Sequence, residues 1–316
     1  MPVLCIVASV VLQAAVYGHV SGRLDSAGSL ALSCAGFGAA ALVFNAVLLV
    51  RGARRGPGAP AAPRARGLLV LMNVVTAVTF LSFYASLTWI PSALATGVET
   101  AIGPAVLALL GLTRFARRVP WRGWAAAAVL VLLGVGCGVR FTGSHGLAAD
   151  AAVRGLALVL VAGAGAAVLA LISAELGRRG VDPVHVTAHR FHLTYLCGAG
   201  LLVVTGGTDG AWTTDPTGTL VTGLLAVTLP LFLLQAGLQR TDPMVSMVLL
   251  TTLPGATYLA ETAFHGSFDP GALALICALI AVAVGYARVG GGEPEAAPAA
   301  VPGGDRAGAR APAPRT

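Results

Sequence analysis

The sequence predicts an all-α protein that crosses a membrane many times. Hydrophobic residues make up 56% of the chain and charged residues only 10%, with a mean hydropathy of +0.84. A soluble domain needs far more charge on its surface, so this composition excludes an ordinary soluble protein. The apolar residues are also gathered into runs of about 20 residues, which is the length that a helix needs to cross a bilayer. Arginines fall mainly between these runs.

Ten apolar runs follow one another along the chain, and we expect each to form a membrane-spanning helix. They lie at 2–20, 27–50, 67–89, 91–113, 121–141, 153–175, 184–206, 216–238, 241–264 and 269–289. The third and fourth runs meet at 89–91, and the eighth and ninth meet at 240–243. A proline and a short polar step mark each of these two turns. The first run has no basic segment before it and no clear cleavage site, so we expect a retained span rather than a signal peptide.

The arginines predict the orientation. One set of connecting segments is rich in them, at 51–66, 114–122, 178–179, 240 and from 288 onward. The opposite set carries only Arg23, Arg140 and Arg154. Cytoplasmic loops of membrane proteins carry the excess of basic residues, so we expect a multi-pass protein of the cytoplasmic membrane with both termini inside the cell.

The net charge of +7 does not indicate a nucleic-acid partner, because the arginines are placed as orientation signals between apolar runs. The segment 291–316 is composed mainly of Gly, Pro and Ala with scattered charges. This composition predicts a disordered cytoplasmic tail.

The sequence also contains an internal repeat. At an offset of 150 residues, 87–104 aligns without gaps over 237–254, and each stretch ends in a proline, Pro104 and Pro254. We therefore expect two five-helix halves, at 1–145 and 150–290. Five is odd, so the second half enters the membrane from the opposite side. Many secondary transporters have such inverted repeats, with the substrate site near the midplane between the halves.

Residues 83–110 read FYASLTWIPSALATGVETAIGPAVLALL, and this stretch resembles the second half of an EamA domain of the drug/metabolite transporter superfamily. The glutamate before Gly-Pro, Glu99, resembles the threonine/homoserine exporter branch. The second half agrees, with AGLQRTDP at 236–243 and with Arg190 in the seventh span. The resemblance implies ten helices in two EamA domains, a central cavity and the export of small metabolites.

Three positions depart from the family pattern. Cys34 stands near the place of an arginine that members often carry in the second span. Gly111 replaces a glutamate that often closes the fourth span, and Leu253 replaces an acidic residue before the second proline. These departures put the substrate of that branch in doubt.

Glu99 is the strongest single candidate for the site. It lies eight residues after Pro91, which is about 12 Å along a helix and close to the middle of the hydrocarbon core. A charged side chain there costs about 2.5–3.5 kcal/mol, so such a group usually faces a cavity or a partner. Thr96 shares its stripe with Ser92 and Gly103. Glu99 could bind an ammonium group or exchange a proton, and the alternative is a neutral acid bonded to a neighbouring helix.

Further candidates come from polar or aromatic residues that share a helix face in other runs. They are Gln13, Asn73, Phe83, Arg190, Gln235, Thr251 and Tyr258. Asn73 could bond a zwitterion through its amide, and Gln13 lies nearer the middle of its span than Tyr17. Tyr17 could line the external mouth of the cavity, but a tyrosine near a span end is more often an anchor at the membrane interface.

The sequence contains no P-loop and no HExxH or GxSxG motif, so we expect neither ATP hydrolysis nor another enzyme activity, and no cofactor. His185, His189 and His192 share a face, but no carboxylate or cysteine is near them in sequence, so we predict no metal site.

These observations predict a secondary transporter that exports a small metabolite, an amino acid or related compound, by alternating access. The expected partners are the small-molecule substrate, the lipid bilayer and protons as a candidate coupling ion, with no oligomeric state predicted. The alternative is a membrane-embedded binding or sensory protein that reuses the fold without net flux.

Overall fold

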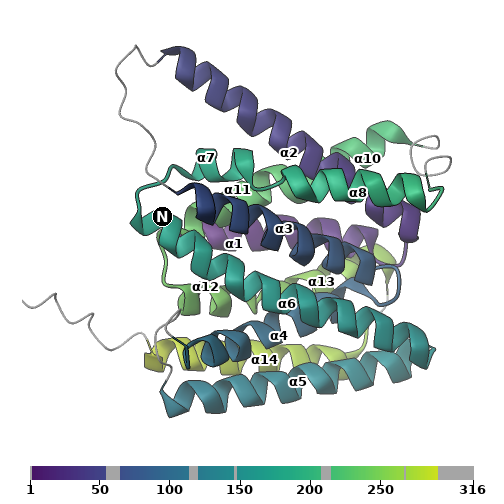
Figure 1. Ribbon diagram of the computed structural model, residues 1–316. Helices are drawn as coiled ribbons and strands as arrows, with labels where there is room; N and C mark the ends of the chain where they lie inside the picture. The colour runs from purple at the N-terminus through teal and green to yellow at the C-terminus, as the bar shows by residue number, and fades with distance from the viewer. Residues whose placement is uncertain are drawn as a thin grey trace, which may run out of the picture.

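A computed structural model describes residues 2–54, 65–113, 120–145, 148–207, 215–266 and 268–290, and within them every regular element is a helix (Figure 1). The all-α prediction is therefore confirmed for this part of the chain. The predicted tail at 291–316 lies outside the described residues.

Helices occupy each of the ten apolar runs. The first five are α1 (Pro2–Val20), α2 (Ser26–Arg54), α3 (Arg66–Ser86), α4 (Ser92–Leu110) and α5 (Trp121–His145). The remaining ones are α6 (Ala149–Arg178), α7 (Pro183–His189), α8 (His192–Val204), α10 (Pro216–Gly223), the π-helical turn η1 (Leu224–Thr228), α11 (Leu229–Leu238), α12 (Pro243–Leu250), α13 (Leu253–His265) and α14 (Pro270–Gly290).

Six of the described helical stretches are long and apolar enough to cross a membrane. They are α1, the part Ser26–Gly52 of α2, α3, α4, α6 and the stretch Thr217–Leu238 that runs through α10, η1 and α11. Shorter apolar stretches lie at Trp121–Gly136 and Pro270–Val282. Long apolar helices of this kind are those of a membrane-embedded protein.

Three of the expected spans are interrupted, which the hydropathy pattern does not reveal. The run at 184–206 is split into α7 and α8, and the run at 241–264 into α12 and α13. The run at 216–238 contains η1, which lies directly before Leu229 and Pro230. Proline lacks the amide that an α-helix needs, so a wider π turn ahead of Pro230 and a break ahead of Pro254 have a local cause.

Helix α6 packs closely against both α3 and α4, because two of its glycines leave room for their backbones. A Cβ atom at Gly163 would lie 2.7 Å from the backbone carbonyl oxygen of Glu99 in α4. A Cβ at Gly165 would overlap the Thr79 hydroxyl oxygen in α3. Because residues 163 and 165 are two positions apart in the helix, α3 and α4 lie on different faces of α6, and each contributes residues to the cavity wall described below.

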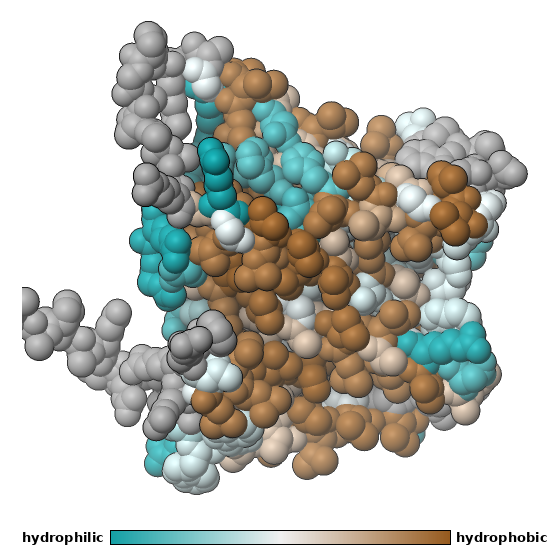
Figure 2. Space-filling view, in the orientation of Figure 1, coloured by the Kyte–Doolittle hydropathy of each residue, from teal (hydrophilic) through white to brown (hydrophobic). Residues whose placement is uncertain are grey.

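On the face shown in Figure 2, hydrophobic residues cover most of the middle and hydrophilic residues lie towards both ends, with a further hydrophilic patch in the upper part of the view. The start of α1 and the end of α14 lie at the same end of the bundle (Figure 1). The exposed apolar side chains include Leu42, Leu49, Leu132 and Val204, each more than two-thirds exposed. An apolar belt of this kind is suited to contact with lipid rather than water.

Candidate functional site

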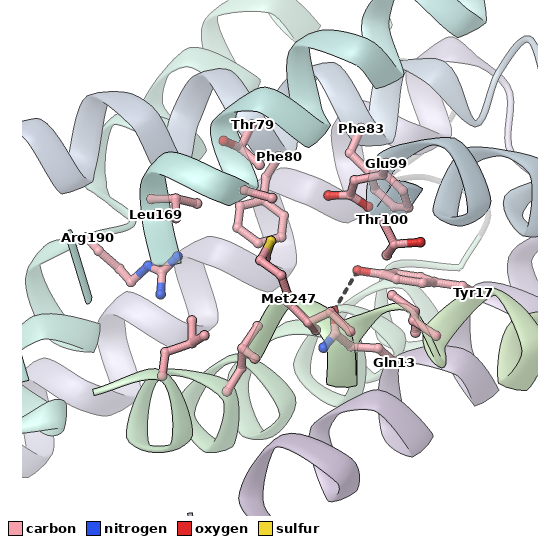
Figure 3. A pocket seen from close by; sticks show the side chains of 15 residues that line it. Gln13, Tyr17, Thr79, Phe80, Phe83, Glu99, Thr100, Leu169, Arg190 and Met247 are labelled. Carbon is pink, nitrogen blue, oxygen red and sulfur yellow. Dashed lines mark hydrogen bonds between the residues drawn. The ribbon is translucent and has the colours of Figure 1, made fainter. Parts of the chain in front are cut away.

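A cavity lies in the centre of the bundle, lined by side chains from both halves of the sequence (Figure 3). The centre of a water-sized sphere can occupy about 60 Å³ of this cavity. One water molecule needs about 10–15 Å³ on the same measure, so the cavity has room for more than one water. The lining residues are Gln13, Tyr17, Thr79, Phe80, Phe83, Glu99, Thr100, Ala166, Leu169, Arg190, Leu234, Leu238, Met247, Leu250 and Leu253. Most of the lining is apolar, so its few polar groups would orient a ligand.

Glu99 is the acidic group of the cavity. It extends from α4 and is partly buried, next to Phe80, Phe83 and Thr100 (Figure 3). Among the described residues, none donates a hydrogen bond to its carboxylate. Within the described residues, the acid therefore faces the cavity and lacks the hydrogen bond from a neighbouring helix that a purely structural role would require.

Three polar residues of α1 form a short hydrogen-bonded chain beside Glu99. The Tyr17 hydroxyl donates to Gln13 Oε1 at 3.2 Å, and Gln13 Nε2 donates to the Ser9 hydroxyl at 2.8 Å. Tyr17 is only 2% exposed and contacts the Phe83 ring, with centroids 5.2 Å apart. These contacts fix both polar tips at the cavity wall.

Arg190 is the basic group of the cavity. It stands at the junction of α7 and α8 and is 2% exposed. Its Nη1 donates to Gln235 Oε1 at 2.7 Å, and its Nε donates to the Thr76 hydroxyl at 3.3 Å. The Ser173 hydroxyl also donates to Gln235 Oε1, at 3.3 Å. Arg190 is therefore held by neutral acceptors on α3 and α11.

The acid and the guanidinium of the cavity are not joined in an ion pair. The ion pairs found among the described residues join other side chains, and neither Glu99 nor Arg190 takes part in one. In Figure 3, Arg190 lies at one end of the cavity and Glu99 at the other, with Phe80, Leu169 and Met247 between them. An apolar cavity with an acid and a guanidinium at separate places is complementary to a molecule that carries both charges.

The predicted site residues divide into two groups. Gln13, Phe83, Glu99 and Arg190 line the cavity, and Gln235 contacts it through Arg190. The other four lie outside its wall and have other partners. The Thr96 hydroxyl donates to a carbonyl of its own helix, and the Thr251 hydroxyl donates to the Val248 carbonyl at the end of α12. Tyr258 bonds the backbone of Asp269, and Asn73 bonds the backbone at the junction of α7 and α8.

Several lining residues were not among the predicted site residues. Tyr17 is a cavity residue and not an interface anchor, and its spacing of four from Gln13 is the signal that favours this reading. Thr100, next to Glu99, lines the cavity where Thr96 was expected. Pro104 cannot donate to the carbonyl of Thr100, and Pro254 cannot donate to that of Leu250, so each proline frees a carbonyl of a cavity-lining residue.

A set of polar contacts joins the helix ends at the predicted outer side. The Ser21 hydroxyl donates to Glu261 Oε1 at 2.5 Å and accepts from the backbone amide of Ser92 at 3.2 Å, which connects α1, α13 and α4. His265 Nε2 lies 3.0 Å from the carbonyl oxygen of Gly18. These contacts hold the outer ends of three cavity-lining helices together.

A second outer contact joins α5 to the start of α14. Arg140 donates to both carboxylate oxygens of Asp269, at 3.0 and 2.9 Å. These hydrogen bonds from Arg140 are the main cause that lowers the pKa of Asp269 to about 2. The Tyr258 hydroxyl also donates to the Asp269 carbonyl at 2.9 Å, which explains why Tyr258 is turned away from the cavity.

Comparison with known proteins supports the fold and leaves the family open. No family model matches the chain, and no curated protein sequence matches it. A solved structure described only as "Crystal structure of protein" resembles it with a TM-score of 0.65 and 18% sequence identity, over 91% of this chain and 97% of the other. At this identity the likeness shows a shared fold and nothing about activity.

Proposed function

We propose that this protein is a secondary transporter of the EamA type that moves a small zwitterionic metabolite, an amino acid or a related compound, out of the cell. The observation that carries the proposal is an acid, Glu99, and a guanidinium, Arg190, which line one small apolar cavity without forming an ion pair with each other. In this proposal Arg190 binds the carboxylate of the substrate and Glu99 binds its ammonium group or exchanges a proton with it.

The proposed architecture has ten spans in two inverted halves. In this reading α7–α8, α10–η1–α11 and α12–α13 each count as one interrupted span. The start of α1 and the end of α14 lie at the same end of the bundle, which supports an even number of membrane crossings. The arginine distribution supports a cytoplasmic location for that end. Interrupted helices beside a midplane site are a common device of secondary transporters.

Counterflow in proteoliposomes tests the function. Vesicles that contain the purified protein and unlabelled L-threonine should take up radiolabelled L-threonine, and a panel of other amino acids should compete. Binding of the labelled amino acid without counterflow would instead favour the binding or sensory protein. Absence of both for every zwitterion in the panel would refute the proposed substrate class.

Glu99→Gln is the residue test within this assay. It removes the charge and keeps the size, so we expect counterflow to be lost or to become independent of pH while the protein still folds. Glu175→Gln is the matched control, because Glu175 pairs with Arg178 and Arg179 at the end of α6, outside the cavity. Unchanged counterflow in Glu99→Gln would remove Glu99 from the mechanism.

A further inference from the structure

The junction of α7 and α8 is a helix break without a local sequence cause. Helix α7 ends at His189 and α8 begins at His192, and the segment 189–193 reads HRFHL, without proline or glycine. In an uninterrupted α-helix the carbonyl of His189 would accept a hydrogen bond from the amide of Leu193. Sharp breaks without proline or glycine arise where a side chain or water enters this hydrogen-bond ladder.

The side-chain amide of Asn73, from α3, occupies the place of that missing bond. Its Nδ2 donates to the carbonyl of His189 at 2.7 Å, and its Oδ1 accepts from the amide of Leu193 at 2.9 Å. One side chain therefore bonds both the acceptor and the donor of this missing hydrogen bond. Asn45, from α2, adds a single bond to the preceding carbonyl, that of Ala188, at 2.9 Å.

The break lies within a predicted membrane span, where no water replaces a lost backbone bond. Leu193 is 37% exposed, so this side of the break faces away from the bundle centre. Only a group with a donor and an acceptor can bond both open backbone groups, and a neutral primary amide supplies both. Thr76, one turn along α3 from Asn73, accepts from Arg190 Nε at 3.3 Å. Successive turns of α3 thus hold the backbone of the break and the guanidinium that it carries.

We propose that Asn73 is a positioning residue that holds the α7–α8 break open and thereby places Arg190 at the cavity. The inference rests on the proposed function, because it gives Asn73 a part in substrate binding through Arg190. Asn73 was expected at the sequence level to contact the substrate itself, and its contacts assign it to the protein backbone instead.

The backbone bonds can be tested without any substrate. His192–Leu193 is the single His-Leu step in the sequence and His189–Arg190 the single His-Arg step. Labelling with ¹³C-carbonyl histidine together with ¹⁵N-leucine or ¹⁵N-arginine therefore selects the Leu193 amide and the His189 carbonyl in solid-state NMR of the full chain in lipid. Asn73→Ala should shift both signals. Asn73→Asp keeps the acceptor and loses the donor, so it should shift the His189 carbonyl more than the Leu193 amide.

Asn45→Ala is the matched control, because it removes the same type of side chain from the same break but no acceptor of the Leu193 amide. It should leave the Leu193 signal in place. Unchanged Leu193 and His189 signals in Asn73→Ala, or equal shifts in Asn45→Ala, would overturn the assigned bonds whatever the protein transports.

The link to Arg190 is tested by a double-mutant cycle on the counterflow of L-threonine. Asn73→Ala and Arg190→Ala should each raise the half-saturating concentration by about tenfold or more, since loss of one charged hydrogen bond to the substrate has about this effect. The double variant should be no worse than Arg190→Ala alone. Additive losses would mean that Asn73 acts independently of Arg190 and would overturn the positioning role. If the NMR shifts are as expected but the unmodified protein transports no zwitterion, the proposed function is refuted. The hydrogen bonds of Asn73 to the two sides of the break would still stand.

Discussion

The close approach of α6 to α4 behind Glu99 gives a prediction whose size follows from the geometry. Replacing Gly163 by alanine adds a Cβ atom 2.7 Å from the carbonyl oxygen of Glu99 and in overlap with the Ile102 side chain. Ile102 can rotate, but the backbone carbonyl cannot. Carbon and carbonyl oxygen normally stay about 3.3 Å apart or more, so α4 must move by about 0.6 Å relative to α6.

The expected cost is a balance of two effects. Overpacking of a close interface costs about 1–3 kcal/mol. Replacing a glycine inside a helix by alanine gains about 0.5–1 kcal/mol. We therefore expect Gly163→Ala to lower the free energy of unfolding by about 1–2 kcal/mol. Gly200→Ala in α8 is the control with the opposite sign, because a Cβ there meets no atom within 4 Å, and it should gain about 0.5–1 kcal/mol.

Unfolding in mixed micelles with a rising fraction of sodium dodecyl sulfate, followed by circular dichroism, measures both changes. Gly163→Ala should unfold earlier than the unmodified protein and Gly200→Ala later. Because the displaced atom belongs to the backbone of Glu99, Gly163→Ala should also change the pH profile of counterflow, whereas Gly200→Ala should not. An unfolding midpoint of Gly163→Ala at or above that of the unmodified protein would refute the close packing of α4 on α6.

Two further predictions concern the charged contacts. Asp269→Asn should destabilise the protein at neutral pH, because the pKa of Asp269 is lowered to about 2 by Arg140 and an unfolded aspartate titrates near 3.9. An acid whose pKa is lower in the folded protein than in the unfolded chain stabilises the fold above the unfolded pKa, and this stability is lost as the pH falls through the folded pKa. The stabilities of the variant and of the unmodified protein should therefore converge between about pH 4 and 2. A constant difference down to about pH 2 would contradict the ion pair. Gln235→Leu should lower the free energy of unfolding by about 1.5–3 kcal/mol in the detergent titration, because it removes the acceptor of Arg190 Nη1. Gln235→Glu keeps an acceptor and should retain stability. Equal losses in both variants would show that the site requires the shape of the side chain and not its hydrogen bond to Arg190.

The positions of the helices could be predicted from the sequence because a bilayer imposes a simple rule. A segment that crosses hydrocarbon must be apolar and must bond its own backbone, so each apolar run is helical at the predicted place. Counting from a proline turn predicts that Glu99 lies near the middle of its span, and Glu99 lines the central cavity. Gln13 and Phe83 follow from helix periodicity in the same way.

The interruptions could not be predicted in the same way. Pro230 and Pro254 give local warnings for two of them, but the break after His189 depends on Asn73, which lies 116 positions earlier in the chain. A hydropathy pattern reports what each residue prefers and not which distant side chain reaches its backbone. The same reason explains Tyr258: its ring position suited the cavity, but a tertiary hydrogen bond to Asp269 turns the hydroxyl away.

The way in which this chain treats its other charges strengthens the proposal for the central pair. Arg140 with Asp269 and Arg51 with Asp182 are joined across 129 and 131 positions, at partly exposed sites where an ion pair is worth little. Glu99 and Arg190 are deeper, where each unpaired charge costs about 2.5–3.5 kcal/mol, and yet no ion pair joins them in the described part of the chain. A direct pair would offset part of that cost and would occupy both groups that a ligand needs. A ligand with its own ammonium and carboxylate groups removes the cost only while it is bound, which is the condition that a carrier must meet if it is to release its substrate on the other side.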